Sequence, residues 1–305
     1  MTPDSVLFLG FGAPSKPSKT MEFLRIVTRE RPVPEDRLLE VAHHYELIGG
    51  SPYNALVFQQ AVALRRRLRT LGLDVPVYAG MRNWTPFLPD VVRVMSRKGK
   101  LRPAVIPLAS AGGGEAAGRY RQDLAVALGA NPDVQCSPRF VRGWFDDPQF
   151  ARAAAGRIEE ASGESRGRWP AEVPILFTAH SIPCRASAGT SYVDDLLASC
   201  RATADVLGVR EWRLVYQSRS GDPRTPWLEP DICDALREVG TTGVRRVVVQ
   251  PIGFLQDHVE VLFDLDLEAA DLARELGVTM HRAGTVGDHP EFIDLLARRV
   301  MELCE

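Results

Sequence analysis

The 305-residue sequence lacks three features that mark specialised classes of protein. It has no basic excess, since 37 Lys and Arg are balanced by 39 Asp and Glu, and this disfavours a nucleic-acid partner. No apolar run approaches the roughly 20 residues of a membrane-spanning helix, so we expect no transmembrane segment. The five cysteines include no Cys-x-x-Cys pair, which disfavours a disulfide framework or an iron–sulfur cluster and predicts reduced thiols in the cytoplasm.

A dinucleotide-binding motif is also missing. Gly10-Phe11-Gly12 follows the first apolar run, but no third glycine stands at Rossmann spacing, and Pro14 occupies the place where the helix should begin. We interpret the segment as a tight turn that lets the backbone approach a neighbour or a ligand.

Short apolar runs alternate with longer segments of helical period, which is typical of parallel sheets covered by helices on both faces. The predicted strands are Ser5–Leu9, Pro76–Tyr78, Ala104–Leu108, Val134–Ser137, Ile175–Ala179, Arg213–Gln217, Arg246–Gln250 and Thr279–His281. The predicted helices are Lys19–Thr28, Glu35–Leu47, Tyr53–Leu71, Leu88–Arg97, Glu115–Leu128, Pro148–Ala161, Tyr192–Leu207, Ile232–Val239, Val259–Leu276 and Pro290–Leu303. The pattern predicts an α/β protein with two doubly wound halves of four strands each.

The segment from Ser162 to Pro174 breaks this periodicity and is rich in Gly, Ser, Arg and Glu. We therefore expect an N-terminal domain over residues 1–161 and a C-terminal domain over 174–305, facing each other across a central cleft. Ligands of such folds lie beyond the carboxyl ends of the strands. The segments that leave the strands are therefore the places to look for chemistry.

His180 directly follows the predicted strand Ile175–Ala179 and precedes Pro183. An isolated histidine is more often structural, but a histidine at a strand end can point into a cleft. There a neutral imidazole can accept a proton or bind a metal ion.

An acidic series begins the predicted helix Val259–Leu276. Glu260, Asp264 and Glu268 are four residues apart, so an α-helix places them in one line. Such a line is either a solvated face or, among the apolar neighbours found here, a file of oxygen ligands for a divalent cation.

A third candidate follows the strand Arg213–Gln217. Gln217 and Ser218 end that strand, and a long loop leads to Trp227. The indole either packs on its own domain or stacks on a flat aromatic ligand.

Together these segments resemble the ferrochelatases. The motifs that carry the resemblance are His180-Ser181-Ile182-Pro183, Tyr216-Gln217-Ser218, Pro226 to Asp231, Gly253 to Asp264, Ile48 to Pro52, Arg82 to Pro86 and His289 to Phe292. They follow one another in the family's order over essentially the whole chain. The chain is most similar to bacterial members without a C-terminal extension, including those that act on coproporphyrin, and this implies a monomer.

The resemblance implies insertion of ferrous iron into a porphyrin in haem biosynthesis, with porphyrin and Fe²⁺ as substrates and no organic cofactor. It gives His180 and Glu260 the catalytic role, in which they accept the two pyrrole protons. It also implies a metal or proton route along His180, Glu260, Asp264 and Glu268. The implied porphyrin contacts are Phe11, Arg29, Tyr45, Ser51, Gln217 and Trp227.

Two segments depart from the family pattern. Phe11 stands where many coproporphyrin-type members have a tyrosine able to ligate iron, and Ser110 to Glu115, with Gly112 to Gly114 inside it, replaces hydroxyl and aromatic residues. These departures leave three hypotheses open. They are iron insertion into coproporphyrin III or protoporphyrin IX, insertion of another metal into another tetrapyrrole such as cobalt into sirohydrochlorin, and porphyrin or haem binding without catalysis.

Overall fold

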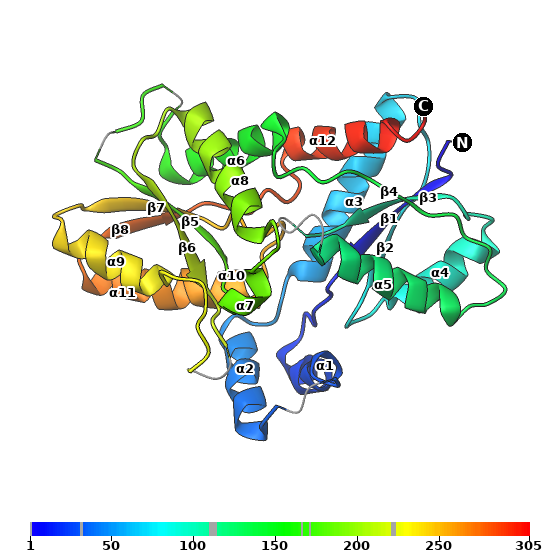
Figure 1. Cartoon of the computed structure of the whole chain (residues 1–305), viewed down its shortest axis with the longest axis horizontal. Helices are drawn as coiled ribbons and strands as arrows, with labels where there is room; N and C mark the ends of the chain where they lie inside the picture. The colour runs from blue at the N-terminus through cyan, green and yellow to red at the C-terminus, as the bar shows by residue number, and fades with distance from the viewer. Residues whose placement is uncertain (1, 31–32, 110–114, 166, 171, 221–223) are drawn as a thin grey trace. The chain divides into compact units, whose positions relative to one another are not determined.

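The computed structural model describes residues 2–30, 33–109, 115–165, 167–170, 172–220 and 224–305, and it divides the chain into two compact units (Figure 1). The first unit holds the chain up to Ala109, Glu115–Gly143 and Phe292–Glu305, and the second holds Trp144–Glu291. Each unit contains one four-stranded parallel sheet, as the alternating pattern predicts.

The sheet of the first unit has the strand order β2-β1-β3-β4. Its strands are β1 (Ser5–Gly10), β2 (Val77–Met81), β3 (Pro103–Pro107) and β4 (Arg139–Phe140). Its helices are η1 (Pro17–Lys19), α1 (Thr20–Val27), α2 (Glu35–Leu47), α3 (Tyr53–Thr70), α4 (Leu88–Arg97) and α5 (Glu115–Gly129), and most of α12 (Pro290–Met301) also belongs to it. The central strand β1 is buried at every position, as expected for a strand covered on both faces.

The second unit repeats this arrangement with the order β6-β5-β7-β8. Its strands are β5 (Ile175–His180), β6 (Trp212–Gln217), β7 (Arg246–Gln250) and β8 (Thr279–Arg282). Its helical segments are α6 (Pro148–Ser162), α7 (Cys184–Ser187), α8 (Tyr192–Leu207), α9 (Ile232–Thr241), α10 (Val259–Phe263), η2 (Asp264–Ala269) and α11 (Ala270–Glu275). The chain winds outward in both directions from β5 and β7, so the switch point of the sheet lies between these two strands.

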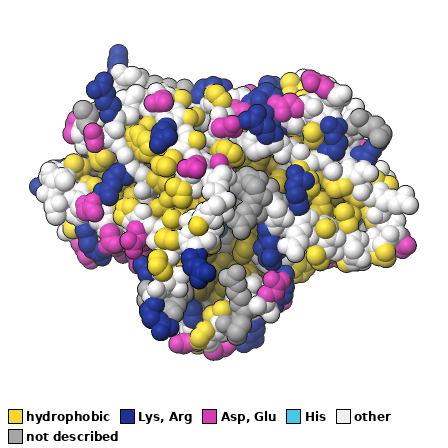
Figure 2. All heavy atoms as spheres, viewed as in Figure 1, with side chains coloured by type: hydrophobic (Ala, Val, Ile, Leu, Met, Phe, Trp, Pro, Cys, Tyr) yellow, Lys and Arg dark blue, Asp and Glu magenta, His cyan; other side chains and the backbone are white. Residues whose placement is uncertain are grey.

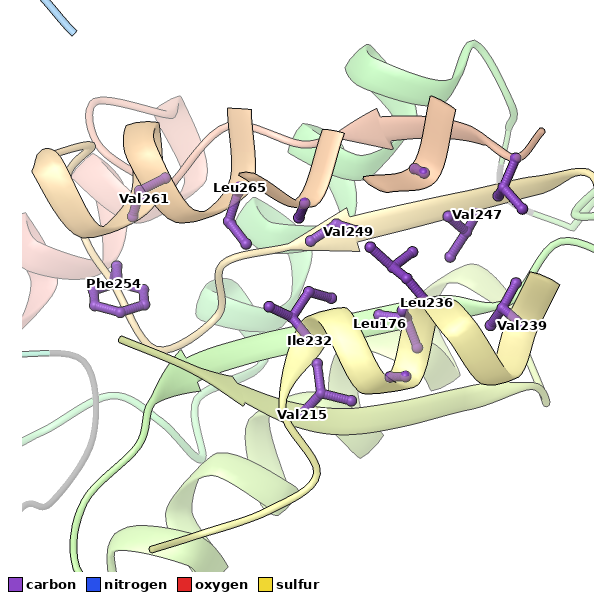
Figure 3. Close-up of a cluster of buried hydrophobic side chains, with 14 residues drawn as sticks. Leu176, Val215, Ile232, Leu236, Val239, Val247, Val249, Phe254, Val261 and Leu265 are labelled. Atoms are coloured by element: carbon purple, nitrogen blue, oxygen red, sulfur yellow. The ribbon is translucent and has the colours of Figure 1, made fainter. Parts of the chain in front are cut away.

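A hydrophobic core fixes the segment that carries the acidic series (Figure 3). Val261 of α10 and Leu265 of η2 are fully buried and belong to one cluster with Val249 of β7 and Ile232 of α9. Burial of one such side chain stabilises the fold by roughly 1.5–3 kcal/mol. These contacts therefore anchor the helix start next to the carboxyl ends of the strands.

The predicted strand Val134–Ser137 is wrong, because the fourth strand of the first unit is the short β4. Val134 donates its backbone N–H to Asn131 and Cys136 donates to Val134, so these groups close local turns instead of joining the sheet. Arg139 and Phe140 pair with Ala104 and Val105 of β3.

The single predicted helix over 259–276 is interrupted. Residues Asp264–Ala269 form a π-helical segment, η2, between α10 and α11. Such segments are rare and frequently occur at functional sites. The spacing of the acidic series therefore differs from that of a regular α-helix.

The compact units divide the chain elsewhere than at Ser162 to Pro174. Helix α6 lies in the second unit and packs against α8 and the strands β7 and β8. Most of α12 lies in the first unit, where Arg67 pairs with Asp294 at 2.6 Å and Arg139 donates to the carbonyl of Leu303 at 2.5 Å.

Acidic and basic side chains are intermixed on the displayed face of the molecule (Figure 2), in keeping with the balanced composition. Among the described residues, no helix is both long and apolar enough to cross a membrane.

Candidate active site

An imidazole and a carboxylate meet at the switch point of the second sheet. His180 is the last residue of β5, and its Nδ1 lies 3.1 Å from Oε2 of Glu260 in the first turn of α10. About a third of each side chain is exposed, 34% for His180 and 37% for Glu260. Because Nδ1 is engaged by Glu260, any further partner of the imidazole would have to bind through the other ring nitrogen, Nε2.

The loop after β7 brings Glu260 to His180 because a glycine permits a close approach. The backbone N–H of Gly253 donates to the carbonyl of Thr178 at 2.9 Å. A Cβ atom at position 253 would lie 2.6 Å from the Cβ of Ala179, the residue before His180. A larger residue would therefore push the loop, and α10 behind it, away from the end of β5.

The contact between His180 and Glu260 shifts both pKa values so that the charged form of each side chain is favoured. Burial disfavours a charged imidazole, but the Glu260 carboxylate and, more weakly, Asp264 outweigh it and raise the pKa of His180 above 6.5. Burial also disfavours charge on Glu260, yet the charge and hydrogen bond of His180 lower the pKa of Glu260 below 4.5. The imidazole is therefore a stronger base than a free histidine, and the carboxylate stabilises its protonated form.

Asp264 is the second carboxyl group of the site. Its Oδ2 accepts hydrogen bonds from the Ser218 hydroxyl and, at 3.4 Å, from Nε2 of Gln217, which also donates to the backbone carbonyl of Glu260 at 2.6 Å. Burial and the neighbouring carboxylates raise the pKa of Asp264 to about 7, although both hydrogen bonds oppose the rise. This group can therefore take up or release a proton near neutral pH.

Ser218, which donates its hydroxyl to Asp264, has a left-handed backbone conformation. Its φ angle is 61°, a left-handed conformation that costs a non-glycine residue roughly 1–2 kcal/mol. Sequence reasoning named Ser218 only as part of a motif, and a positive φ at a serine gives no signal in the sequence.

Glu268 lies at the far end of the acidic series. Burial and the charge of Asp231 raise the pKa of Glu268 above 4.5, and Arg237 opposes this rise. Among the described residues, no group of three or more His, Cys, Asp or Glu side chains is arranged to hold a metal ion. His180 contacts Glu260, and the charges of Glu260 and Glu268 both act on Asp264. The role of these four residues with a metal ion remains a prediction.

Trp227 lies beside the histidine motif because two backbone segments pair. The N–H of Leu228 donates to the carbonyl of Ile182 at 3.0 Å, and the Ser181 hydroxyl donates to the carbonyl of Leu228 at 2.9 Å. The indole Nε1 is buried and has no hydrogen-bond partner among the described residues. The ring itself is half-buried.

Two residues that sequence reasoning did not single out support the pair. The Tyr192 hydroxyl donates to the backbone carbonyl of His180 at 2.8 Å. Nδ1 of His258 accepts the backbone N–H of Glu260 at 3.2 Å and so caps α10, while burial lowers the pKa of His258. His258 directly precedes the helix, but histidine is not a favoured N-cap residue, and nothing in the sequence links Tyr192 to His180.

The predicted porphyrin contacts of the first unit surround the loop after β1. Arg29 donates to the side chain of Asn83 at 3.3 Å, and the backbone N–H of Asn83 donates to the carbonyl of Phe11. Phe23 packs edge-on against both Phe11 and Tyr45, with ring centroids 6.3 and 5.9 Å apart.

The four predicted contacts differ in exposure, because Phe11 and Arg29 are exposed and Tyr45 and Ser51 are buried. Phe11 is 41% exposed, whereas Tyr45 and Ser51 are 3% and 2% exposed and support the loop from inside. Ser51 donates its backbone N–H to the carbonyl of Pro14, and its hydroxyl accepts the N–H of Tyr53. The Gly112 to Gly114 run and the side chain of Glu115 lie outside the described residues.

Fold and site together define a class. The second unit is a doubly wound sheet that presents a strengthened base, a carboxylate partner and further carboxyl groups beside its central strands, an arrangement suited to removing protons next to a cation. Comparison with known proteins identifies the family within this class. The family model described as Ferrochelatase matches residues 3–303, and the chain belongs to the ferrochelatase family.

Curated relatives agree with this assignment. The ferrochelatase of Rhodopirellula baltica is 41% identical over 301 residues, which cover 98% of this chain and 86% of the relative. The coproporphyrin III ferrochelatase of Streptomyces griseus is 41% identical over 97% of this chain and 85% of its own length. The enzyme of the same name from Mycolicibacterium smegmatis is 39% identical, with 99% and 90% covered.

A solved structure supports the fold. SirB from Bacillus subtilis with Fe³⁺ has a TM-score of 0.61 and 14% sequence identity, with 99% of this chain and 96% of that chain covered. The prediction of a chelatase-like α/β fold is therefore confirmed.

Proposed function

We propose that this protein inserts Fe²⁺ into a porphyrin and that coproporphyrin III is its substrate. The observation that carries the proposal is the 3.1 Å contact between His180 and Glu260 in a chain of the ferrochelatase family. The choice of porphyrin is supported by relatives that carry the name coproporphyrin III ferrochelatase.

The chemistry needs a base beside the macrocycle, because two pyrrole protons leave as the metal enters. Nε2 of His180 accepts one proton; the Glu260 carboxylate bonded to Nδ1 stabilises the imidazolium that forms and then accepts the other, so the pair takes up both. Asp264, with a pKa of about 7, passes protons onward toward Glu268 and solvent. The carboxylates also offer oxygen ligands to the entering cation.

The remaining site residues position the porphyrin in this proposal. The ring of Trp227 packs on the macrocycle near His180, whereas Gln217 is fully buried and acts by holding the backbone of Glu260 and the carboxylate of Asp264. For Phe11, Arg29, Tyr45 and Ser51, a porphyrin contact is what the family resemblance implies. The five cysteines are free, which supports a reducing compartment such as the cytoplasm.

The test is an anaerobic insertion assay in which Fe²⁺ is offered with coproporphyrin III or with protoporphyrin IX. We expect turnover that is faster with coproporphyrin III and lost in His180→Ala. His281→Ala, which removes a half-buried histidine from β8, should retain activity and is the matched control. Equal turnover by His180→Ala and the wild type would refute the assigned base.

Two other outcomes separate the alternatives. Cobalt insertion into sirohydrochlorin without iron insertion would assign the protein to a different chelatase activity. Tight porphyrin binding with a shifted Soret band and no metal turnover would indicate a binding protein.

A further inference from the structure

Arg282 connects two aspartates that flank the carboxylates of the site. It is the last residue of β8, and its Nε and Nη2 lie 2.7 Å from the two carboxylate oxygens of Asp266. Its Nη1 lies 3.1 Å from Oδ2 of Asp257. The Arg282 side chain is only 17% exposed, and those of Asp257 and Asp266 are 20% and 33% exposed.

The geometry is that of a specific clamp. A guanidinium group that binds one carboxylate through two parallel hydrogen bonds is fixed in orientation, which a single ammonium group cannot reproduce. Arg274, on α11 of the same helical segment, also forms an ion pair with an aspartate, but this pair is exposed. Its partner Asp271 lies three residues away on α11, both side chains are more than half exposed, and such a surface pair contributes little to stability.

The two partners of Arg282 lie at the start of α10 and inside the π-helical segment η2. Asp257 directly precedes His258, the residue that caps α10, and Asp266 lies within the π-helical segment η2. Glu260 and Asp264 stand between them in the chain. One guanidinium therefore fixes both the start of the helix and its widened turn.

The register of that turn determines where Asp264 points. Successive residues of an α-helix are rotated by about 100°, so a change of one residue in register would turn a side chain to another face. In the observed register, Asp264 reaches the hydroxyl of Ser218 and the amide of Gln217. Val261 and Leu265 hold the helix against the core, but apolar contacts do not fix its rotation as hydrogen bonds do.

We infer that Arg282 is a positioning residue, which holds α10 and η2 in the register that aligns Glu260 and Asp264 beside His180. The consequence for catalysis rests on the proposed function, whereas the consequence for the helix does not. Arg282 itself touches neither His180 nor Glu260 in any hydrogen bond of the described chain.

The activity test compares Arg282→Gln and Arg282→Lys with Arg274→Gln as the matched control. Loss of a residue that orients such groups typically lowers activity by roughly 10- to 100-fold. We expect a loss of that size in kcat for iron insertion by Arg282→Gln, with the KM for porphyrin within about twofold of the wild type. Arg282→Lys should recover only part of the loss, because it keeps the charge without the fork. Arg274→Gln should retain wild-type kinetics.

Hydrogen–deuterium exchange tests the helix independently of activity. In Arg282→Gln, amides of 259–269 should exchange at least about tenfold faster, while those of β5 and β7 keep their wild-type protection. Asp266→Asn removes the same clamp from the other side and should reproduce both effects if Arg282→Gln does not fold.

The outcomes separate the two proposals. A wild-type protein without iron insertion would overturn the proposed function, and the exchange pattern would still decide the role of Arg282. Unchanged exchange over 259–269, or equally faster exchange over the whole second unit, would overturn the positioning role. So would full rescue of kcat by lysine.

Discussion

Replacement of Asp264 with asparagine should change how the stability of the protein depends on pH. Burial raises the pKa of this carboxyl group from 3.8 to about 7, with Glu260 and Glu268 adding to the rise. The unfolded chain loses the proton near pH 3.8, whereas the folded chain keeps it up to about pH 7. Between these values the folded state binds more protons, so the wild-type free energy of unfolding decreases as the pH rises through this window.

The size of the effect follows from the same two values. The interval from 3.8 to about 7, at about 1.36 kcal/mol per pH unit, sets a ceiling of about 4 kcal/mol. Asp264 is partly exposed, so solvent screening reduces this, and we expect roughly 1–2 kcal/mol. The amide of Asp264→Asn cannot ionise. The variant should therefore be more stable than the wild type at pH 8, and its advantage should shrink as the pH falls toward 5.

Urea unfolding followed by circular dichroism at pH 5, 6, 7 and 8 measures this difference. The contributions of all other titrating groups to the free energy of unfolding largely cancel between the wild type and Asp264→Asn. Asp271→Asn, which removes an exposed carboxylate from α11, is the control and should not reproduce the slope. A gap between wild type and Asp264→Asn that stays constant or widens toward acid would refute the reasoning.

Two further substitutions test the pair and the first unit. Glu260→Gln should lower the melting temperature most between about pH 4.5 and 6.5, because the raised pKa of His180 contributes stability below 6.5 and the lowered pKa of Glu260 contributes it above 4.5. An unchanged melting temperature at pH 6 would contradict a stabilising pair. Phe11→Tyr should alter the visible spectrum of bound iron porphyrin by adding a phenolate ligand, and an unchanged spectrum would mean that Phe11 does not face the metal.

Most of the fold could be predicted because buried parallel strands have a strong sequence signal. β1 and β5 each carry four apolar side chains among six residues, and the helices that follow show a clear period. The sequence signal fails where tertiary contacts determine the secondary structure, as at β4, whose two residues become a strand only by pairing with β3. The π-helical segment could not be predicted either, because its sequence has an ordinary helical pattern.

The site could be predicted in its residue types and in its place at the strand ends. His180 and Glu260 are 80 residues apart in the chain and lie 3.1 Å apart in the fold; the motif resemblance pairs them, whereas their spacing does not. The contacts that support the site could not be predicted from the sequence. The bond from Tyr192 to the His180 carbonyl and the clamp of Arg282 on Asp266 depend on how elements pack, and a single sequence does not encode that packing in any local pattern.

The acidic series shows why residue identity does not give the sign of an effect. Read as like charges four residues apart, Glu260, Asp264 and Glu268 should each relieve repulsion when neutralised. In the fold, Glu260 faces the imidazole of His180, so its neutral variant leaves a cation without its partner. Asp264 faces other carboxylates in a partly buried position, so its neutral variant removes an unfavourable charge. The two variants should therefore change stability in opposite directions. If the neutral variants of Glu260 and Asp264 both gained stability, repulsion between like charges would explain the two results, and the contact between His180 and Glu260 would contribute little to stability.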